Sequence, residues 1–145
     1  MTNFSHLGAL EVSPDTTSEY TLHQITVNGA SPVLTVAPAT EANKPYFNAL
    51  LKRASKTARQ IQAGAVNTGL IEENRLEDRE LYPKHIIKGW HDVFDADGTK
   101  VNFNRGNLKE FLDALPDWLF DDLRSYCGSP ANFSELVDIE TSAKN

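Results

Sequence analysis

Apolar residues form two short extended runs near the N-terminus. Residues 20–27 alternate loosely and are rich in Tyr, Thr, Ile and Val, and residues 33–37 are again β-branched. Asn28-Gly29 lies between the runs, and both residue types tolerate the positive φ angles of a tight hairpin turn. Pro32 and Pro38 bracket the second run, and proline cannot donate to a β-ladder. The pattern predicts an N-terminal β-hairpin whose second strand is short and lies at a sheet edge.

From residue 43 onwards the apolar positions recur at helical spacing. Asn43-Lys44-Pro45 is typical of a helix start, because proline suits the first helical position. The apolar stripe of this first helix is Phe47, Leu50, Leu51, Ala54, Ala58 and Ile61. A second helix is expected over roughly residues 72–90. Pro83 should kink or break it, because a proline inside a helix removes a hydrogen bond and costs about 3 kcal/mol.

Two further helices follow a short extended segment at residues 100–103. Asn104 or Asn107 could cap the first of them, Pro116 separates the two, and Gly128 ends the second. We therefore predict a mainly helical α+β fold, with a small N-terminal β-hairpin followed by four or five helices. Residues 1–18 are expected to form an irregular arm, 19–133 a single globular domain and 134–145 a polar C-terminal tail.

Composition narrows the class of protein. The chain has 145 residues, which suits one domain, and its 40% hydrophobic residues are too many for a disordered chain. A formal net charge of −6 argues against nucleic acid as the main partner, since phosphate binding favours a basic surface. One cysteine cannot form an internal disulfide. We find no signal peptide and no apolar run long enough for a membrane span, so the cytoplasm is the expected location.

The segment Asp95-Ala96-Asp97-Gly98 is the strongest candidate for a metal site. A calcium loop needs an acidic first residue and a glutamate at position twelve, with glycine at position six. Placing Gly98 sixth puts Val93 first and Asn104 twelfth, and neither fits. The segment is therefore predicted to be a tight turn.

Other reactive residues lack partners at a useful spacing. His85 and His91 are six positions apart, which does not place two imidazoles on one helix face toward one metal. Cys127 follows an apolar helix face, and a lone cysteine of this kind is usually a small core residue. Adjacent acidic pairs, such as Asp121 with Asp122, point about 100° apart on a helix and do not converge. We therefore expect no catalytic site, no metal site and no cofactor.

Two groups of residues are candidates for binding another protein. A basic stripe on the first predicted helix consists of Lys52, Arg53, Lys56 and Arg59 and contains no acidic residue. It could be a solvated face, a dock for an acidic partner, or a dock for the chain's own acidic segment at 72–80. Most of the aromatic rings should lie in the core, but at least one should be exposed, and exposed aromatics often anchor interfaces. The candidate partner-binding residues are Lys52, Arg53, Lys56, Arg59, Trp90, Trp118 and Phe120.

The order of several short motifs resembles a known family. These motifs are Leu81-Tyr82-Pro83-Lys84-His85-Ile86-Ile87-Lys88-Gly89-Trp90, Val93-Phe94-Asp95-Ala96-Asp97-Gly98, Val101-Asn102-Phe103, Leu115-Pro116-Asp117-Trp118-Leu119-Phe120 and Pro130-Ala131-Asn132-Phe133. Their layout, together with the helix at residues 46–53, is similar to that of the tail assembly chaperones of tailed bacteriophages. The resemblance covers roughly residues 33–133.

This resemblance implies a role in virion assembly in the host cytoplasm. Such chaperones cover the aggregation-prone tape-measure protein and help to recruit tail-tube subunits, so these would be the partners, and the chain could also form a homo-oligomer. One alternative is a structural virion protein, such as a tail, neck or head accessory component that stays in the particle beside neighbouring subunits. Another is an enzyme or inhibitor that acts on a host protein, although the sequence shows no set of polar residues that would converge on one site.

Overall fold

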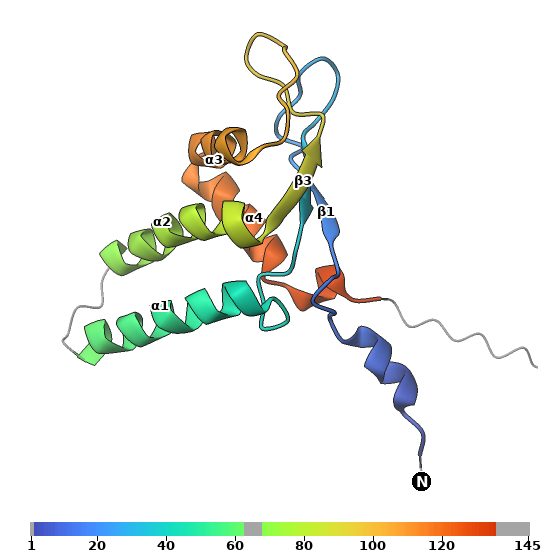
Figure 1. Cartoon of the computed structure of the whole chain (residues 1–145), viewed down its shortest axis with the longest axis vertical. Helices are drawn as coiled ribbons and strands as arrows, with labels where there is room; N and C mark the ends of the chain where they lie inside the picture. The colour runs from blue at the N-terminus through green and yellow to red at the C-terminus, as the bar shows by residue number, and fades with distance from the viewer. Residues whose placement is uncertain (1, 63–67, 136–145) are drawn as a thin grey trace, which may run out of the picture.

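The computed structural model describes residues 2–62 and 68–135, with the side chains of residues 56, 57, 60–62 and 68–70 outside that description. The fold is α+β and mainly helical. The described part contains these elements in chain order: η1 (Ser5–Leu10), β1 (Ser18–Thr21), β2 (Val33–Val36), α1 (Lys44–Gln62), α2 (Thr68–His85), β3 (Ile87–His91), α3 (Arg105–Ala114), α4 (Asp117–Cys127) and η2 (Pro130–Phe133). Figure 1 shows α3 and α4 beside a small sheet, with α1 and α2 extending from it as a pair.

The N-terminal hairpin is present, with shorter strands than the sequence pattern predicts. β1 and β2 pair antiparallel with Ser18 opposite Val36 and Thr21 opposite Val33. Asn28 and Gly29 have φ angles of 55° and 77°, as the predicted tight turn requires. This turn closes only an isolated bridge between Val27 and Ala30, so it forms the tip of a longer loop between the strands.

The prediction that the second strand lies at an edge is wrong, because β2 is the central strand in the order β1-β2-β3. The third strand comes from residues 87–91, which we expected at the end of the second helix. α2 runs through Pro83 without a break and ends at His85. β-branched Ile86 and Ile87 come next and favour an extended chain, which then pairs with β2.

The core lies between the sheet and the inner faces of α2, α3 and α4. Leu34 and Val36 of β2 are fully buried, as are Leu112 of α3 and Leu123 of α4. Tyr82 of α2 lies in the middle, with ring centroids 5.9 Å from Tyr46 and 5.5 Å from Phe120. Edge-to-face packing of this kind adds to the burial of the three rings.

Local signals place the last two helices correctly. The Asn104 side chain accepts a hydrogen bond of 2.8 Å from the Asn107 backbone N–H, so Asn104 is the N-cap of α3. Pro116 directly precedes α4, and Gly128 follows its last residue. Asp117 lies in the first turn of α4, where a negative charge suits the helix dipole.

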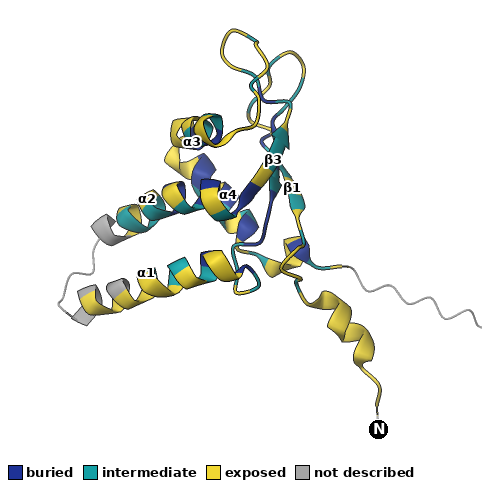
Figure 2. Cartoon of the chain, viewed as in Figure 1, coloured by how far each residue is buried: buried dark blue, intermediate teal, exposed yellow. Residues whose placement is uncertain are grey.

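The structure describes most of the N-terminal arm and the first residues of the C-terminal tail. The expected irregular arm at residues 1–18 contains the 3-10 helix η1, and every residue of η1 is exposed (Figure 2). Val12 then packs partly against the core. Of the predicted polar tail at 134–145, residues 136–145 lie outside the described part of the chain.

Candidate protein-binding surface

Asp78 of α2 joins three helices through one buried carboxylate. Only 2% of the residue is exposed. Arg53 of α1 donates to its Oδ1 atom at 2.7 Å, and Arg124 of α4 donates from Nε to its Oδ2 atom at 2.7 Å. The Tyr46 hydroxyl of α1 adds a hydrogen bond of 3.0 Å to Oδ1. A buried charge is tolerated only when paired and hydrogen-bonded, so these contacts fix where α1 and α4 sit on α2.

The protonation of this cluster follows from burial and from the Asp78 charge. Burial, together with the neighbouring carboxylate, raises the pKa of Tyr46 to about 12, so the hydroxyl stays a donor. Burial alone would lower the pKa of Arg53, but the pairing with Asp78 outweighs it and raises the pKa. The same balance raises the pKa of Arg124. Both guanidinium groups therefore stay charged across the physiological range, and the cluster positions the three helices.

A second set of arginines fastens the turn between α3 and α4 to α2. Arg79 donates to the carbonyl oxygens of Leu112 and Leu115, which end α3, and its guanidinium lies 4.5 Å from the Phe120 ring centroid. Arg79 also pairs with Asp117 at 2.9 Å. The bond to Leu115 gives the C-cap carbonyl of α3 a donor, whereas the Leu112 carbonyl also accepts from the Leu115 backbone N–H.

Arg75 extends the same contact one turn towards the N-terminus of α2. Its Nε and Nη2 atoms donate to the two carboxylate oxygens of Asp121 at 2.9 and 2.8 Å, a bidentate arrangement. The two arginines are four residues apart on α2, and Asp117 and Asp121 are four apart on α4. Sequence reasoning missed this network, although the matching spacing of the two pairs is a signal for it.

Trp118 is the one exposed ring among the three aromatic candidates. It is 56% exposed, and it directly follows Asp117, which Arg75 and Arg79 hold in place. The start of α4 is therefore a fixed part of the fold, and the large indole on it is accessible. An accessible, rigidly mounted tryptophan is a common anchor at protein interfaces.

The other two aromatic candidates do not reach the surface in the same way. Phe120 is fully buried under Arg79, so we correct its assignment from a surface anchor to a core residue. Trp90 is half-buried, with edge-to-face contacts to Phe103 and Phe111 at 5.3 and 5.4 Å between ring centroids. Its indole N–H donates to the Val101 carbonyl at 3.1 Å, so Trp90 mainly braces the loop after β3.

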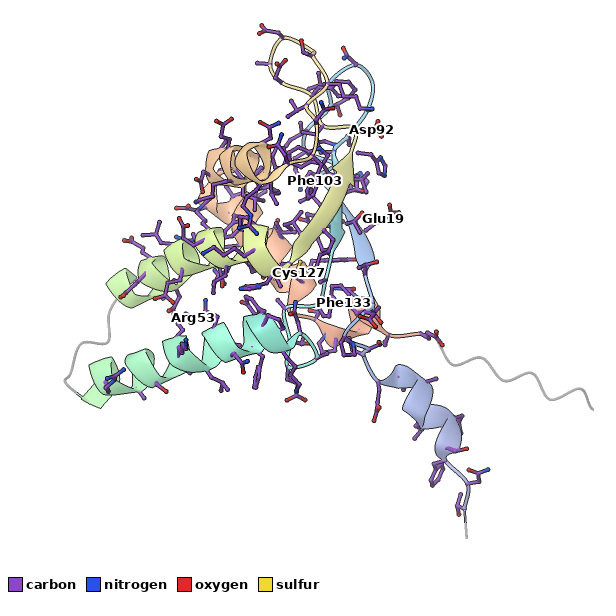
Figure 3. All side chains as sticks on the ribbon, in the orientation of Figure 1. Glu19, Arg53, Asp92, Phe103, Cys127 and Phe133 are labelled. Carbon is purple, nitrogen blue, oxygen red and sulfur yellow. The ribbon has the colours of Figure 1, made fainter. Side chains whose placement is uncertain are left out.

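The basic stripe divides into members with different roles. Arg53 points from α1 towards α2 (Figure 3) and binds Asp78, so it docks on the chain's own acidic segment at 72–80. Lys52 and Arg59 are exposed. Within the part of the chain that the structure describes, neither forms an ion pair. The side chain of Lys56 lies outside the described residues.

The apolar stripe expected on α1 is uncovered in part: Leu50 packs against the core, and the side chain of Ile61 lies outside the described residues. Leu51 is 50% exposed, and Ala54 and Ala58 are exposed as well. α1 extends beyond the sheet, and along its outer half α2 is the helix beside it (Figure 1). On α2 itself, Ile71 and Leu76 are 61% and 63% exposed. The helical pair therefore presents apolar side chains that the core does not use.

An open groove lies between α2 and α3. Its apolar lining residues are Leu76, Leu115 and Pro116, and its charged lining residues are mostly acidic. Lys109 of α3 lies among them and pairs with Glu80 at 2.9 Å and Asp113 at 2.8 Å. The two bases that line the groove, Lys109 and Arg79, therefore both pair with acids of its own lining.

The predicted turn at residues 95–98 is confirmed. The Asp95 carboxylate accepts hydrogen bonds of 2.9 Å from the backbone N–H groups of Asp97 and Thr99, and Gly98 has a φ angle of 80°. Asn28 donates to the Gly98 carbonyl at 3.0 Å, which joins this turn to the tip of the β1–β2 loop. The turn thus has a structural use in holding the two loops together.

The reactive side chains singled out in the sequence lie in different elements of the described chain. Cys127 is fully buried in the core, as expected, and burial raises the pKa of its thiol. His91 is exposed beside Glu19 and Asp92, whereas His85 lies at the end of α2. Among the described residues we find no group of three or more His, Cys, Asp or Glu that could hold a metal ion.

Comparison with known proteins identifies one family. A family model described as YdaY prophage protein matches residues 41–145, which is most of the chain. No curated protein matches the chain, and no solved structure matches it. Within the described residues, no helix combines the length and the apolar character that crossing a membrane requires.

Proposed function

Because this chain belongs to the YdaY prophage protein family, which makes it a phage-related protein, we propose that it is a tail assembly chaperone. In this proposal it binds a phage tape-measure or tail-tube protein in the host cytoplasm while the virion is assembled. The observation that carries the proposal is the exposed Trp118 on a rigidly held helix start. The resemblance of the motif order to tail assembly chaperones supports the choice of partner.

The proposed mechanism is physical and needs no catalytic group. Long helical proteins such as a tape measure expose apolar stripes that aggregate unless they are covered. Trp118 would insert into such a stripe, because a tryptophan buries a large area with few rotatable bonds. The ion pairs of Asp117 with Arg75 and Arg79 fix the backbone that carries the ring, so little order is lost on binding.

Mass spectrometry of purified particles beside an infected-cell lysate tests the assembly role. A chaperone is expected in the lysate and absent from the particle. Presence in the particle at fixed stoichiometry would contradict the chaperone and support a structural virion protein. That second candidate is favoured by the N-terminal arm, where Phe4, Leu7 and Leu10 are 62%, 49% and 45% exposed, because such arms often pack against neighbouring subunits.

A capture assay tests the role of Trp118. Tagged protein is co-expressed with the tape-measure protein and, separately, with the tail-tube protein of the same phage. Replacing Trp118 with alanine is expected to lower capture at least tenfold, which corresponds to about 1.4 kcal/mol of binding free energy. Phe4→Ala is the matched control, since it removes another exposed aromatic ring and should leave capture unchanged. Equal capture by both variants would contradict the proposal.

A further inference from the structure

The tip of the β1–β2 loop carries the pair Asn28-Gly29, which is the only Asn-Gly pair in the sequence. Both residues are exposed, and their φ angles of 55° and 77° make them the central residues of a tight turn. Val27 and Ala30 close this turn with backbone hydrogen bonds of 2.9 and 3.1 Å, one in each direction. The turn therefore presents the Asn-Gly pair to solvent.

The surroundings of Gly29 are open. Glycine has no Cβ, and a Cβ built at this position would meet no heavy atom within 4 Å. The Gly29 N–H donates to no backbone carbonyl of the described residues. A backbone nitrogen that directly follows an asparagine can close a ring with the side-chain Cγ of that asparagine. The Gly29 nitrogen is therefore an unhindered nucleophile beside the Asn28 amide.

The Asn28 side chain joins two loops that are far apart in the sequence. Its Nδ2 atom donates to the Gly98 carbonyl at 3.0 Å. Among the described residues, this is the one hydrogen bond between the β1–β2 loop and the turn at residues 95–98. Figure 1 shows the two loops side by side at the end of the molecule opposite η1. The connection between the loops therefore depends on an amide N–H at residue 28.

We propose that Asn28 is a deamidation site, and that its conversion to an acid separates the two loops. The Gly29 nitrogen attacks Cγ of Asn28 and closes a succinimide ring, while Nδ2 leaves as ammonia with the proton that the Gly29 nitrogen gives up. Water then opens the ring to aspartate or isoaspartate, so no oxidant or reductant is needed. An ionised carboxylate has no N–H for the Gly98 carbonyl, and it adds a negative charge next to a turn that already contains Asp95 and Asp97.

The Asn28–Gly98 bond also controls the rate of this reaction. Attack on Cγ requires the Asn28 side chain to rotate, and the bond restricts that rotation. Weakening it should speed the reaction about twofold to tenfold, the range that the net strength of one hydrogen bond corresponds to. Asp95→Ala weakens it, because the Asp95 carboxylate holds the turn through the N–H groups of Asp97 and Thr99. The inference is independent of the proposed function.

Peptide mass spectrometry of the folded full-length protein, sampled over time at slightly alkaline pH, tests the site and the rate. Asn28 should convert to the acid first, whereas the exposed Asn48 and Asn102, each followed by a residue with a side chain, should remain amides. Asp97→Ala is the matched control for Asp95→Ala. It removes a charge from the same turn, but its carboxylate accepts no hydrogen bond from the described residues, so Asn28 should convert at the unmodified rate. Conversion of Asn28 no faster than of Asn48 and Asn102 would overturn the site, and equal rates in the two aspartate variants would overturn the role of the Asn28–Gly98 bond.

The variant Asn28→Asp tests the structural consequence separately from the reaction. Hydrogen exchange should rise about twofold to tenfold at the backbone amides of Asp97, Gly98 and Thr99, which are hydrogen-bonded within the turn. Asn48→Asp adds the same charge at an exposed position of α1 and should leave this exchange unchanged. Both variants should stay folded by circular dichroism. Unchanged exchange in Asn28→Asp would show that the acid keeps the loops together, which would overturn the inference.

Discussion

Arg53 and Arg124 share one acceptor, since each donates at 2.7 Å to a different oxygen of the Asp78 carboxylate. The two arginines come from α1 and α4, which meet the same buried residue of α2 from two sides. The charge cluster therefore joins α1 and α2 to α4, in addition to the apolar core into which Tyr46 and Tyr82 pack. This relationship leads to the first prediction.

Replacing Asp78 with alanine should destabilise the protein strongly. The substitution leaves two partly buried guanidinium groups without their carboxylate, and breaking a buried ion pair by removing one partner costs about 3–5 kcal/mol. Urea denaturation followed by circular dichroism measures the change in the free energy of unfolding. The control is Asp113→Ala, at an exposed residue of α3, which should change stability by less than about 0.5 kcal/mol.

An Asp78→Ala protein with nearly unchanged stability would show that the cluster contributes little. Arg53→Glu gives an independent check of the cluster, because it places a second carboxylate beside Asp78 and should also destabilise the protein. For this reason a variant that reverses the charge of the whole basic stripe is expected to unfold, and only Lys52 and Arg59 are suitable for testing that surface.

Arg79→Lys should be costly although it keeps the positive charge. The guanidinium reaches two carbonyl oxygens and one carboxylate at once and stacks on Phe120, whereas an ammonium group cannot reproduce this planar set of contacts. We expect a loss of about 1–3 kcal/mol in the free energy of unfolding, because the Leu115 carbonyl loses its donor and the Leu112 carbonyl keeps only the Leu115 backbone N–H. Arg105→Lys, at an exposed arginine of α3, is the control and should be nearly neutral. Equal effects of the two substitutions would contradict this role of Arg79.

Stability should fall in acid partly through Asp121. Hydrogen bonds from Arg75, and then from Arg124, lower the pKa of this carboxyl below its ordinary value of 3.8. The folded state therefore binds the proton less readily than the unfolded state, and the stabilisation is present above 3.8 and lost as the pH falls through the lowered folded value. Unfolding measured between about pH 5 and about pH 2 should show a smaller loss for Arg75→Gln than for the unmodified protein. An identical pH profile for the two proteins would rule out this contribution.

The Cys127 thiol should react only when the protein opens. It is fully buried, and burial raises its pKa, so little thiolate is present in the folded state. Labelling with an aromatic disulfide reagent should be slow in buffer and fast in denaturant. Ser125→Cys in a Cys127→Ala background provides the exposed control and should label at once. Rapid labelling of native Cys127 would show that the core opens locally around α4.

Local signals in the sequence predict the turns and the ends of helices well. Asn28 and Gly29 adopt positive φ, Asn104 caps α3, and Gly128 follows α4, because each of these outcomes depends on a few neighbouring residues. β3 was missed for the opposite reason. Its Trp90 continues a helical spacing with Tyr82 and Ile86, and only pairing with residues 33–36, far away in the chain, makes the segment a strand.

The candidate surface is predictable from the sequence only in part. The sequence predicts that at least one aromatic ring is exposed, but it does not show that this ring is Trp118 rather than Phe120. The exposed stripe of α1 could not, since an amphipathic pattern shows which side chains prefer burial but not whether a neighbour covers them. The docking of Arg53 on the acidic segment was one of several alternatives, and its specific partner, Asp78, depends on how two helices are placed in space.

The central position of β2 determines when the protein can fold during its synthesis. β2 leaves the ribosome early, but one of its edges cannot pair until residues 87–91 have been synthesised. Its buried face cannot be covered until α4 has been synthesised. The contact between the Ser18 and Tyr126 hydroxyls joins positions more than a hundred residues apart. Until nearly the whole domain has emerged, β2 of the nascent hairpin has an unpaired edge. At this stage chains aggregate or need help from the host's own folding machinery.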